Sequence, residues 1–244
     1  MNTRPTPLRE SGAPLSLASR PIAAACVVSA GATALSYALP ESYAATAVGL
    51  CFLVATYLLA LRDPTDSARA WGLALGGLLE PEPLEGRRLG RALGRALGTA
   101  ALVALVVFPP FWVGFRVWYE TRGAFQVPAE WALLDAALGQ LLVIALPEEA
   151  FFRGYLQTAL ARRWPPTLRV GGALVGKDVL VTSALFALGH FATEPHPARL
   201  AVFFPSLVFG WLRARTGGIG ASVVFHAACN LFASLLARGY GLTP

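Results

Sequence analysis

Six polar side chains that lie within apolar stretches of the sequence have the chemistry needed to hydrolyse a peptide bond. A carboxylate and a histidine can together take a proton from a water molecule that attacks a carbonyl carbon. A second histidine and an amide can donate hydrogen bonds to the oxyanion that forms. The six residues are Glu148, Glu149, Arg153, His190, His226 and Asn230. Because charged and titratable groups are costly in apolar surroundings, we interpret them as a candidate site.

The spacing of the first three residues gives the two adjacent carboxylates different environments. Glu149 and Arg153 are four residues apart, so on a helix they face the same side and can form an ion pair. Glu148 points about 100° away and stays free to titrate. Pro147 has no N–H to offer the carbonyl of Val143, which predicts a polar defect beside Glu148 where water can bind.

Metal-assisted hydrolysis is the alternative chemistry for the same residues. Two histidines and a carboxylate, here Glu148, His190 and His226, can also form a metal triad. The sequence has no HExxH motif, and Asn230 is a poor zinc ligand but a good donor to an oxyanion. We therefore expect no cofactor, with a divalent metal left open as the alternative.

Two classes without hydrolytic activity also fit a polar cluster of this kind. A Glu–Arg pair can simply fix how helices pack, which would suit a membrane immunity factor or scaffold. Glu148, His190 and His226 could instead relay protons in a transporter, although the sequence lacks the internal repeats common in that class. His196 lies in the proline-rich segment 194–197, and we interpret it as a loop residue.

The composition is typical of a membrane protein. Of 244 residues, 55% are hydrophobic and only 14% are charged, against about 25% charged in soluble domains. Nineteen of the twenty basic residues are arginine, and no basic face carries the interleaved aromatics of a nucleic-acid site, so we expect no nucleic-acid partner. Cys26, Cys51 and Cys229 form neither a metal motif nor a disulfide framework, and we expect them to be small core residues.

Apolar blocks predict an all-α, polytopic transmembrane bundle of about seven to eight spans with its active site inside. We expect a flexible cytoplasmic tail over residues 1–20 and one protease domain over 21–240, with its motif-bearing core at 131–236. Pro109-Pro110 and Pro205 predict kinks in the third and sixth spans. The predicted spans are Pro21–Leu39, Tyr43–Leu61, Thr99–Tyr119, a fourth from Trp131 onward, Val179–Thr193, Ala198–Leu212 and Gly217–Leu236.

The arginines predict the orientation of these spans. They concentrate in the tail and in the connections after the second, fourth and sixth spans, which places the N-terminus in the cytoplasm. Arg87, Arg91 and Arg95 recur every four residues beside leucines 89, 93 and 97, which predicts an interfacial helix on an anionic leaflet. Counted from the basic helix ends, Glu149, His190 and His226 lie at similar depths, about 21, 20 and 17 Å. One shared site is therefore expected.

Three motifs in this order resemble the CPBP family of CAAX prenyl endopeptidase-like and Abi intramembrane proteases. They are EExxxR at 148–153, FxxxH ending at His190 and HxxxN from His226 to Asn230. The resemblance implies a glutamic peptidase, of a family formerly grouped with the metalloproteases, in which Glu148 and His190 activate water. It further implies that His226 and Asn230 form the oxyanion site and that Glu149 and Arg153 are structural.

The substrate does not carry over from this resemblance. Eukaryotic members trim prenylated tails, whereas bacterial relatives process membrane-anchored proteins, confer bacteriocin immunity or act on C-terminal sorting signals, as in the myxosortase-like group. Richness in Ala, Arg, Gly and Leu with one lysine is typical of a GC-rich bacterial genome. We therefore expect a multi-pass protein of the bacterial inner membrane that cleaves a membrane-anchored protein or peptide.

Overall fold

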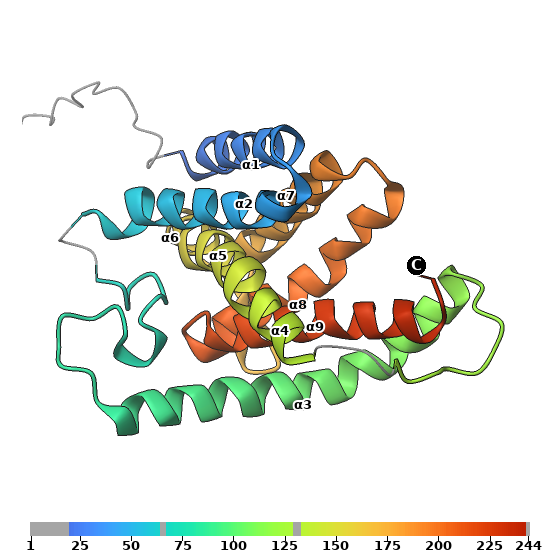
Figure 1. Ribbon diagram of the computed structural model, residues 1–244. Coiled ribbons are helices and arrows are strands. Elements are labelled where there is room, and N and C mark those ends of the chain that lie inside the picture. Colours follow the sequence, from blue (N-terminus) through green and yellow to red (C-terminus); the bar gives the residue numbers. More distant parts are fainter. Residues whose placement is uncertain (1–19, 64–66, 129–132, 243–244) are drawn as a thin grey trace, which may run out of the picture.

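The computed structural model describes residues 20–63, 67–128 and 133–242. Apart from Arg20, the predicted tail lies outside these residues, as does Trp131, the predicted start of the fourth span. The described chain is built from helices and one short hairpin, so the predicted all-α class is confirmed. Most of the long helices lie side by side with their connections gathered at two opposite ends (Figure 1).

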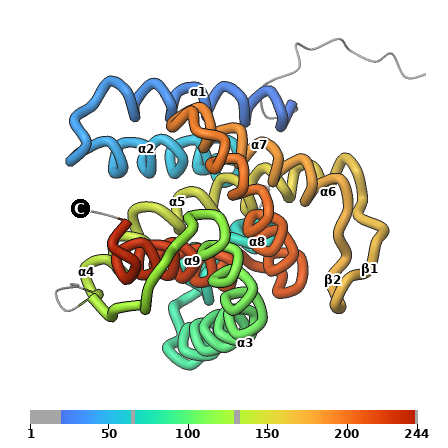
Figure 2. Tube along the Cα trace, turned by 90° about the vertical axis from the view of Figure 1, so that its right-hand side faces the viewer, coloured from blue at the N-terminus to red at the C-terminus, as the bar shows by residue number. Residues whose placement is uncertain are grey.

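The first two helices form an antiparallel pair on one side of the molecule. Helix α1 (Pro21–Ala38) begins with proline, whose fixed φ suits a first helical turn. Helix α2 (Glu41–Thr56) follows a turn at Pro40 and continues as a π-helical turn over Tyr57–Leu61. Figure 2 shows the pair as a layer that lies apart from α3 and α9. This pair forms one wall of the candidate site.

Helix α3 (Gly86–Trp118) changes the prediction for the arginine-rich segment. The expected interfacial helix and the third span are one continuous helix, because the four-residue pattern of arginines and leucines runs into the apolar block without a stop signal. Pro109 and Pro110 lie inside this helix, and its last turns run at an angle to its first part (Figure 1). A 3₁₀ turn over Leu75–Gly77 in the preceding connection packs against it.

The segment that carries the two glutamates is helical without a break from Leu133 to Arg163. It comprises α4 (Leu133–Leu138), α5 (Leu146–Glu149) and α6 (Thr158–Arg163), joined by π-helical stretches over Gly139–Ala145 and Ala150–Gln157. Such wide turns are frequent at functional sites because each re-aims the side chains that follow.

The carbonyl of Val143 faces α2 in the structure. A Cβ atom built on Gly49 would lie 2.6 Å from the Val143 oxygen, so only glycine allows this approach. The polar defect predicted beside Glu148 is therefore a site of close helix packing.

A two-stranded antiparallel hairpin, which the sequence did not predict, follows α6. Strand β1 (Leu168–Val170) pairs with β2 (Ala173–Val175), with Leu168 opposite Val175. Helix α7 (Lys177–Thr193) then leads to a 3₁₀ segment (Pro197–Val202), α8 (Phe203–Thr216) and α9 (Gly220–Gly239). Pro205 is the third residue of α8, where its missing N–H would have no helical partner. The kink predicted inside the sixth span is thus a helix start.

Four helices of the described chain are long and apolar enough to cross a membrane, and the protein is accordingly a membrane protein. They are Pro21–Ala38, Glu41–Leu61, Gly86–Trp118 and Gly220–Gly239. Helices α7 and α8 are shorter, with 17 and 14 residues. The count of seven to eight spans therefore stays a prediction.

Candidate active site

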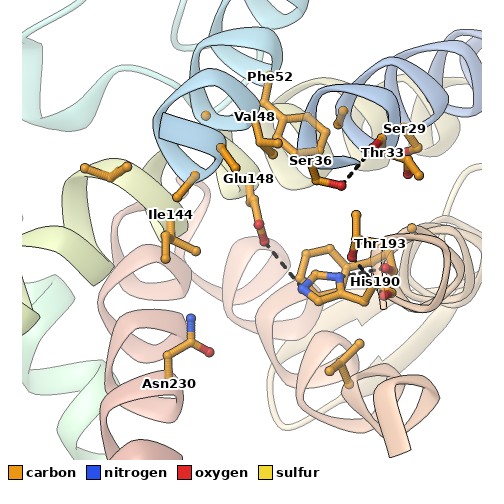
Figure 3. Close-up of a pocket in the computed structure, with 18 of the residues that line it drawn as sticks. Ser29, Thr33, Ser36, Val48, Phe52, Ile144, Glu148, His190, Thr193 and Asn230 are labelled. Carbon is orange, nitrogen blue, oxygen red and sulfur yellow. Dashed lines mark hydrogen bonds and ion pairs between the residues drawn. The ribbon is translucent and has the colours of Figure 1, made fainter. Parts of the chain in front are cut away.

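Three helices bring the candidate residues together inside the bundle. Glu148 lies at the end of α5, His190 on α7 and His226 on α9. Glu148 Oε2 lies 4.0 Å from His190 Nε2 and 3.8 Å from His226 Nε2. The carboxylate therefore stands between two imidazoles from different helices, and Figure 3 shows it extending toward His190.

The ion pair expected from the spacing of Glu149 and Arg153 is present. Arg153 Nη1 lies 3.1 Å from Glu149 Oε1, and both side chains are fully buried. Arg153 Nη2 also donates to the hydroxyl of Ser206 at 2.6 Å and to its carbonyl at 3.2 Å. The guanidinium lies 4.6 Å from the ring centre of Phe186. These contacts join the glutamate helix to α7 and α8.

His226 contacts the second glutamate, a contact that the sequence did not indicate. Its Nδ1 lies 3.0 Å from Glu149 Oε1, and its ring stacks on Phe209 with centroids 4.6 Å apart. Because a carboxylate only accepts hydrogen bonds, Nδ1 carries the proton in this contact. Glu149 therefore orients His226 as well as pairing with Arg153.

The orientation of His190 is set by its own helix. Its Nδ1 lies 3.0 Å from the carbonyl oxygen of Phe186, which can only accept, so Nδ1–H is the donor. In the neutral ring the Nε2 atom that faces Glu148 is then an acceptor. The pair presents two acceptors, Glu148 Oε2 and His190 Nε2, to the space between them.

Asn230 is held by a residue that lies outside the three sequence motifs. Its amide Nδ2 donates to Gln140 Oε1 at 2.8 Å, from α9 to the π-helical stretch before α5. Gln140 could have been identified from the sequence, because it is an amide side chain inside an apolar run. Ser206 gave no such signal, because serine is common in apolar helices.

A cavity of about 540 Å³ opens in front of Glu148 and His190. Figure 3 shows Ser29, Thr33 and Ser36 of α1 on one side of this cavity and Asn230 on another. Glu148 Oε2 is buried and has no hydrogen-bond partner. Other lining residues include Ala44, Val48, Gly49, Phe52, Gln140, Ile144, Phe186, Gly189, Thr193, Arg199 and Ser234.

The remaining polar candidates fall outside this cluster. His196 is exposed and caps the 3₁₀ segment by accepting from the N–H of Ala198, which agrees with its interpretation as a loop residue. Cys26 is exposed on α1, so its expected place in the core was wrong, since an apolar residue of a membrane protein can equally face lipid. Within the described residues, no group of three or more His, Cys, Asp or Glu side chains is arranged to hold a metal ion.

Comparison with known proteins identifies the region that carries this site. Residues 130–232 match the family model of type II CAAX prenyl endopeptidase Rce1-like proteins. No curated protein and no solved structure matches the chain. The matched region contains all six candidate residues on the helices described above. Through this region, the chain is similar to the CPBP family of CAAX prenyl endopeptidase-like proteases.

Proposed function

We propose that the protein is an intramembrane endopeptidase that hydrolyses a peptide bond of a membrane-anchored protein or peptide. The observation that carries this proposal is the position of Glu148 Oε2, which is buried, lacks a hydrogen-bond partner and lies between two imidazole nitrogens at the cavity. A buried polar atom in this state is costly unless it has a function or a bound water. The match of residues 130–232 to a family of prenyl endopeptidases supports the same conclusion.

Glu148 and His190 activate the water in this proposal. One water molecule fits between Glu148 Oε2 and His190 Nε2, since atoms 4.0 Å apart can each lie about 2.8 Å from the same oxygen. Both atoms accept, so the water donates both protons and keeps a lone pair for the carbonyl carbon. The water oxygen bonds to that carbon while Glu148 takes a proton. The C–N bond then breaks and the proton passes to the leaving amine.

His226 and Asn230 stabilise the oxyanion. Because His226 Nδ1–H donates to Glu149, its Nε2 can donate only when the ring is an imidazolium. That form finds an acceptor at each nitrogen, Glu149 on one side and Glu148 or the oxyanion on the other. Asn230 donates one amide N–H to Gln140, and its second N–H is available to donate to the oxyanion.

The membrane environment fits the remaining features of the site. The glutamate segment and helices α7 and α8 would complete the predicted set of seven to eight spans in a bacterial inner membrane. The cavity of about 540 Å³ suits a few residues of extended peptide. Neither a prenyl group nor a metal ion is needed for the chemistry proposed.

Glu148→Gln tests the proposal directly. The substitution keeps the size of the side chain and removes the base, so cleavage of a membrane-anchored reporter should fall about 10²–10⁴-fold. Glu41→Gln, at the exposed start of α2, is the matched control and should cleave like the wild type. Retained cleavage in Glu148→Gln would refute the mechanism. If the protein's phenotype in cells were lost only in variants that unfold the bundle, and kept in Glu148→Gln, a scaffold function would be favoured.

A further inference from the structure

The cavity belongs to one end of the bundle. On α1 its lining runs from Ser29 to Ser36, in the second half of the helix, and on α2 from Ala44 to Phe52, nearer the start than the end of the helical run 41–61. On α7 it includes Phe186, Gly189, His190 and Thr193, and on α9 Asn230, Ala233 and Ser234, again in the second halves. These halves all adjoin the connections at residues 39–40, 194–202 and after 239. The mouth of the cavity therefore lies at this end.

The opposite end is closed by packed side chains. Phe52 lies against Phe151 with ring centroids 5.3 Å apart, and Phe151 contacts Tyr155 at 5.7 Å. Trp71, from the connection between α2 and α3, packs on Tyr155 at 5.8 Å, and this tryptophan is buried. Beside it, Leu73 fills the space over Gly154, where an added Cβ would lie 2.5 Å from Leu73 Cδ2. These side chains form a seal beneath the glutamates.

Basic residues concentrate at the sealed end. Of the described residues there, the basic ones are Arg20, Arg62, Arg69, Arg87, Arg88, Arg91, Arg95, Arg162, Arg163, Arg169, Lys177, Arg213 and Arg215. The basic residues in the described part of the mouth end are Arg116, Arg122, Arg199 and Arg238. Connections rich in Lys and Arg stay in the cytoplasm. The seal therefore faces the cytoplasm and the mouth faces the other side of the membrane.

We propose that the catalytic cavity opens on the non-cytoplasmic face of the membrane, so the substrate is a membrane-anchored segment whose scissile bond has been translocated. This inference rests on the proposed function for its substrate, whereas the direction of the opening rests on the cavity, the seal and the arginines alone. Ser36, Thr193 and Arg199 line the mouth and give it a polar rim. A peptide that emerges from its span on that side reaches Glu148 without crossing the seal.

Accessibility of single cysteines tests the direction of the opening. In the full chain with Cys26, Cys51 and Cys229 replaced by alanine, Ser36→Cys reports on the mouth and Thr167→Cys, at the exposed residue just before the hairpin, on the sealed end. A membrane-impermeant maleimide should label Ser36→Cys in bacterial spheroplasts and Thr167→Cys only in inside-out vesicles. The reverse pattern would overturn the proposal, and labelling of Ser36→Cys from both sides would do so too, because it means an open passage. Absence of labelling before denaturation would show that no mouth exists.

A pair of reporters tests the substrate side separately. Each carries the same scissile segment beside one span, in one reporter on the cytoplasmic side and in the other outside. The outside reporter should be cleaved at least tenfold faster, and a preference for the cytoplasmic reporter would overturn the inference. Cleavage of neither reporter, with Ser36→Cys labelled from outside, would contradict the peptidase function but leave the orientation intact. Glu148→Gln should show the same labelling pattern as the wild type.

Discussion

His226 Nδ1 lies 3.0 Å from Glu149 Oε1, so one buried carboxylate contacts both a histidine of α9 and the arginine one helical turn along its own segment. Glu149 thereby couples the stability of the bundle to the orientation of a candidate catalytic side chain. Its neighbour Glu148 has no hydrogen-bond partner at its Oε2 and lines the cavity. The two adjacent glutamates should therefore respond differently to the same substitution.

Glu149→Gln should lower both stability and cleavage. It leaves Arg153 as an uncompensated buried charge, which typically costs about 3–5 kcal/mol, and it weakens the hold on His226. Thermal unfolding in detergent should show a clear drop in Tm, while Glu148→Gln should unfold like the wild type. Equal loss of stability in the two variants would contradict the separation of roles.

Asn230→Ala should reduce kcat about 10²–10³-fold with little change in KM, as removal of one oxyanion donor does. Gln140→Ala should give a smaller fall in kcat, because it removes the hydrogen bond that holds the Asn230 amide but leaves the amide itself in place. Ser234→Ala is the matched control on the same helix and cavity wall. Steady-state kinetics on a peptide reporter measures all three, and a change confined to KM would argue against an oxyanion role.

Gly49→Ala should destabilise the packing of α2 on the glutamate segment. The added methyl group would lie 2.6 Å from the Val143 carbonyl oxygen, and overpacking of this kind costs about 1–3 kcal/mol. Gly31→Ala is the matched control, since its nearest neighbour would be Cys51 Sγ at 4.0 Å. Thermal unfolding of both variants and the wild type in detergent checks this prediction. Equal Tm values for Gly49→Ala and Gly31→Ala would show that α2 can shift to make room for the methyl group.

The connection before α3 should loosen in acid. The hydrogen bond from Arg69, and also that from Arg88, lowers the pKa of Glu80 from 4.5 to about 2. A lowered pKa stabilises the fold above pH 4.5, and this contribution is lost as the pH falls from 4.5 toward 2. Hydrogen-exchange protection of residues 67–85, measured relative to the intrinsic exchange rate at each pH, should fall over that window. In Glu80→Gln this protection should already be low at neutral pH and should not change further with acid.

Chelation should leave cleavage unchanged, because water activation by Glu148 and His190 requires no metal ion. The assay compares the reporter with and without a strong chelator, at fixed ionic strength. Activity that disappears and returns on addition of a divalent ion would instead assign Glu148, His190 and His226 as ligands.

The sequence alone determined the class of this protein, the location of most helices and the identity of the polar cluster. These features depend on local spacing: apolar blocks define helices, and residues four apart, such as Glu149 and Arg153, share a face whatever surrounds them. The similar depths of Glu149, His190 and His226 followed from helix rise alone, and the structure places their side chains together.

The tertiary structure decided which of these groups touch. The contact of His226 with Glu149, the support of Asn230 by Gln140 and the close approach of Gly49 to Val143 depend on how each helix is rotated against its neighbours. Periodicity within one helix does not contain that rotation, because it is fixed by interdigitation of side chains from several helices at once. The same packing, with Trp71 and Leu73 folded over Tyr155 and Gly154, decided which end of the cavity is closed.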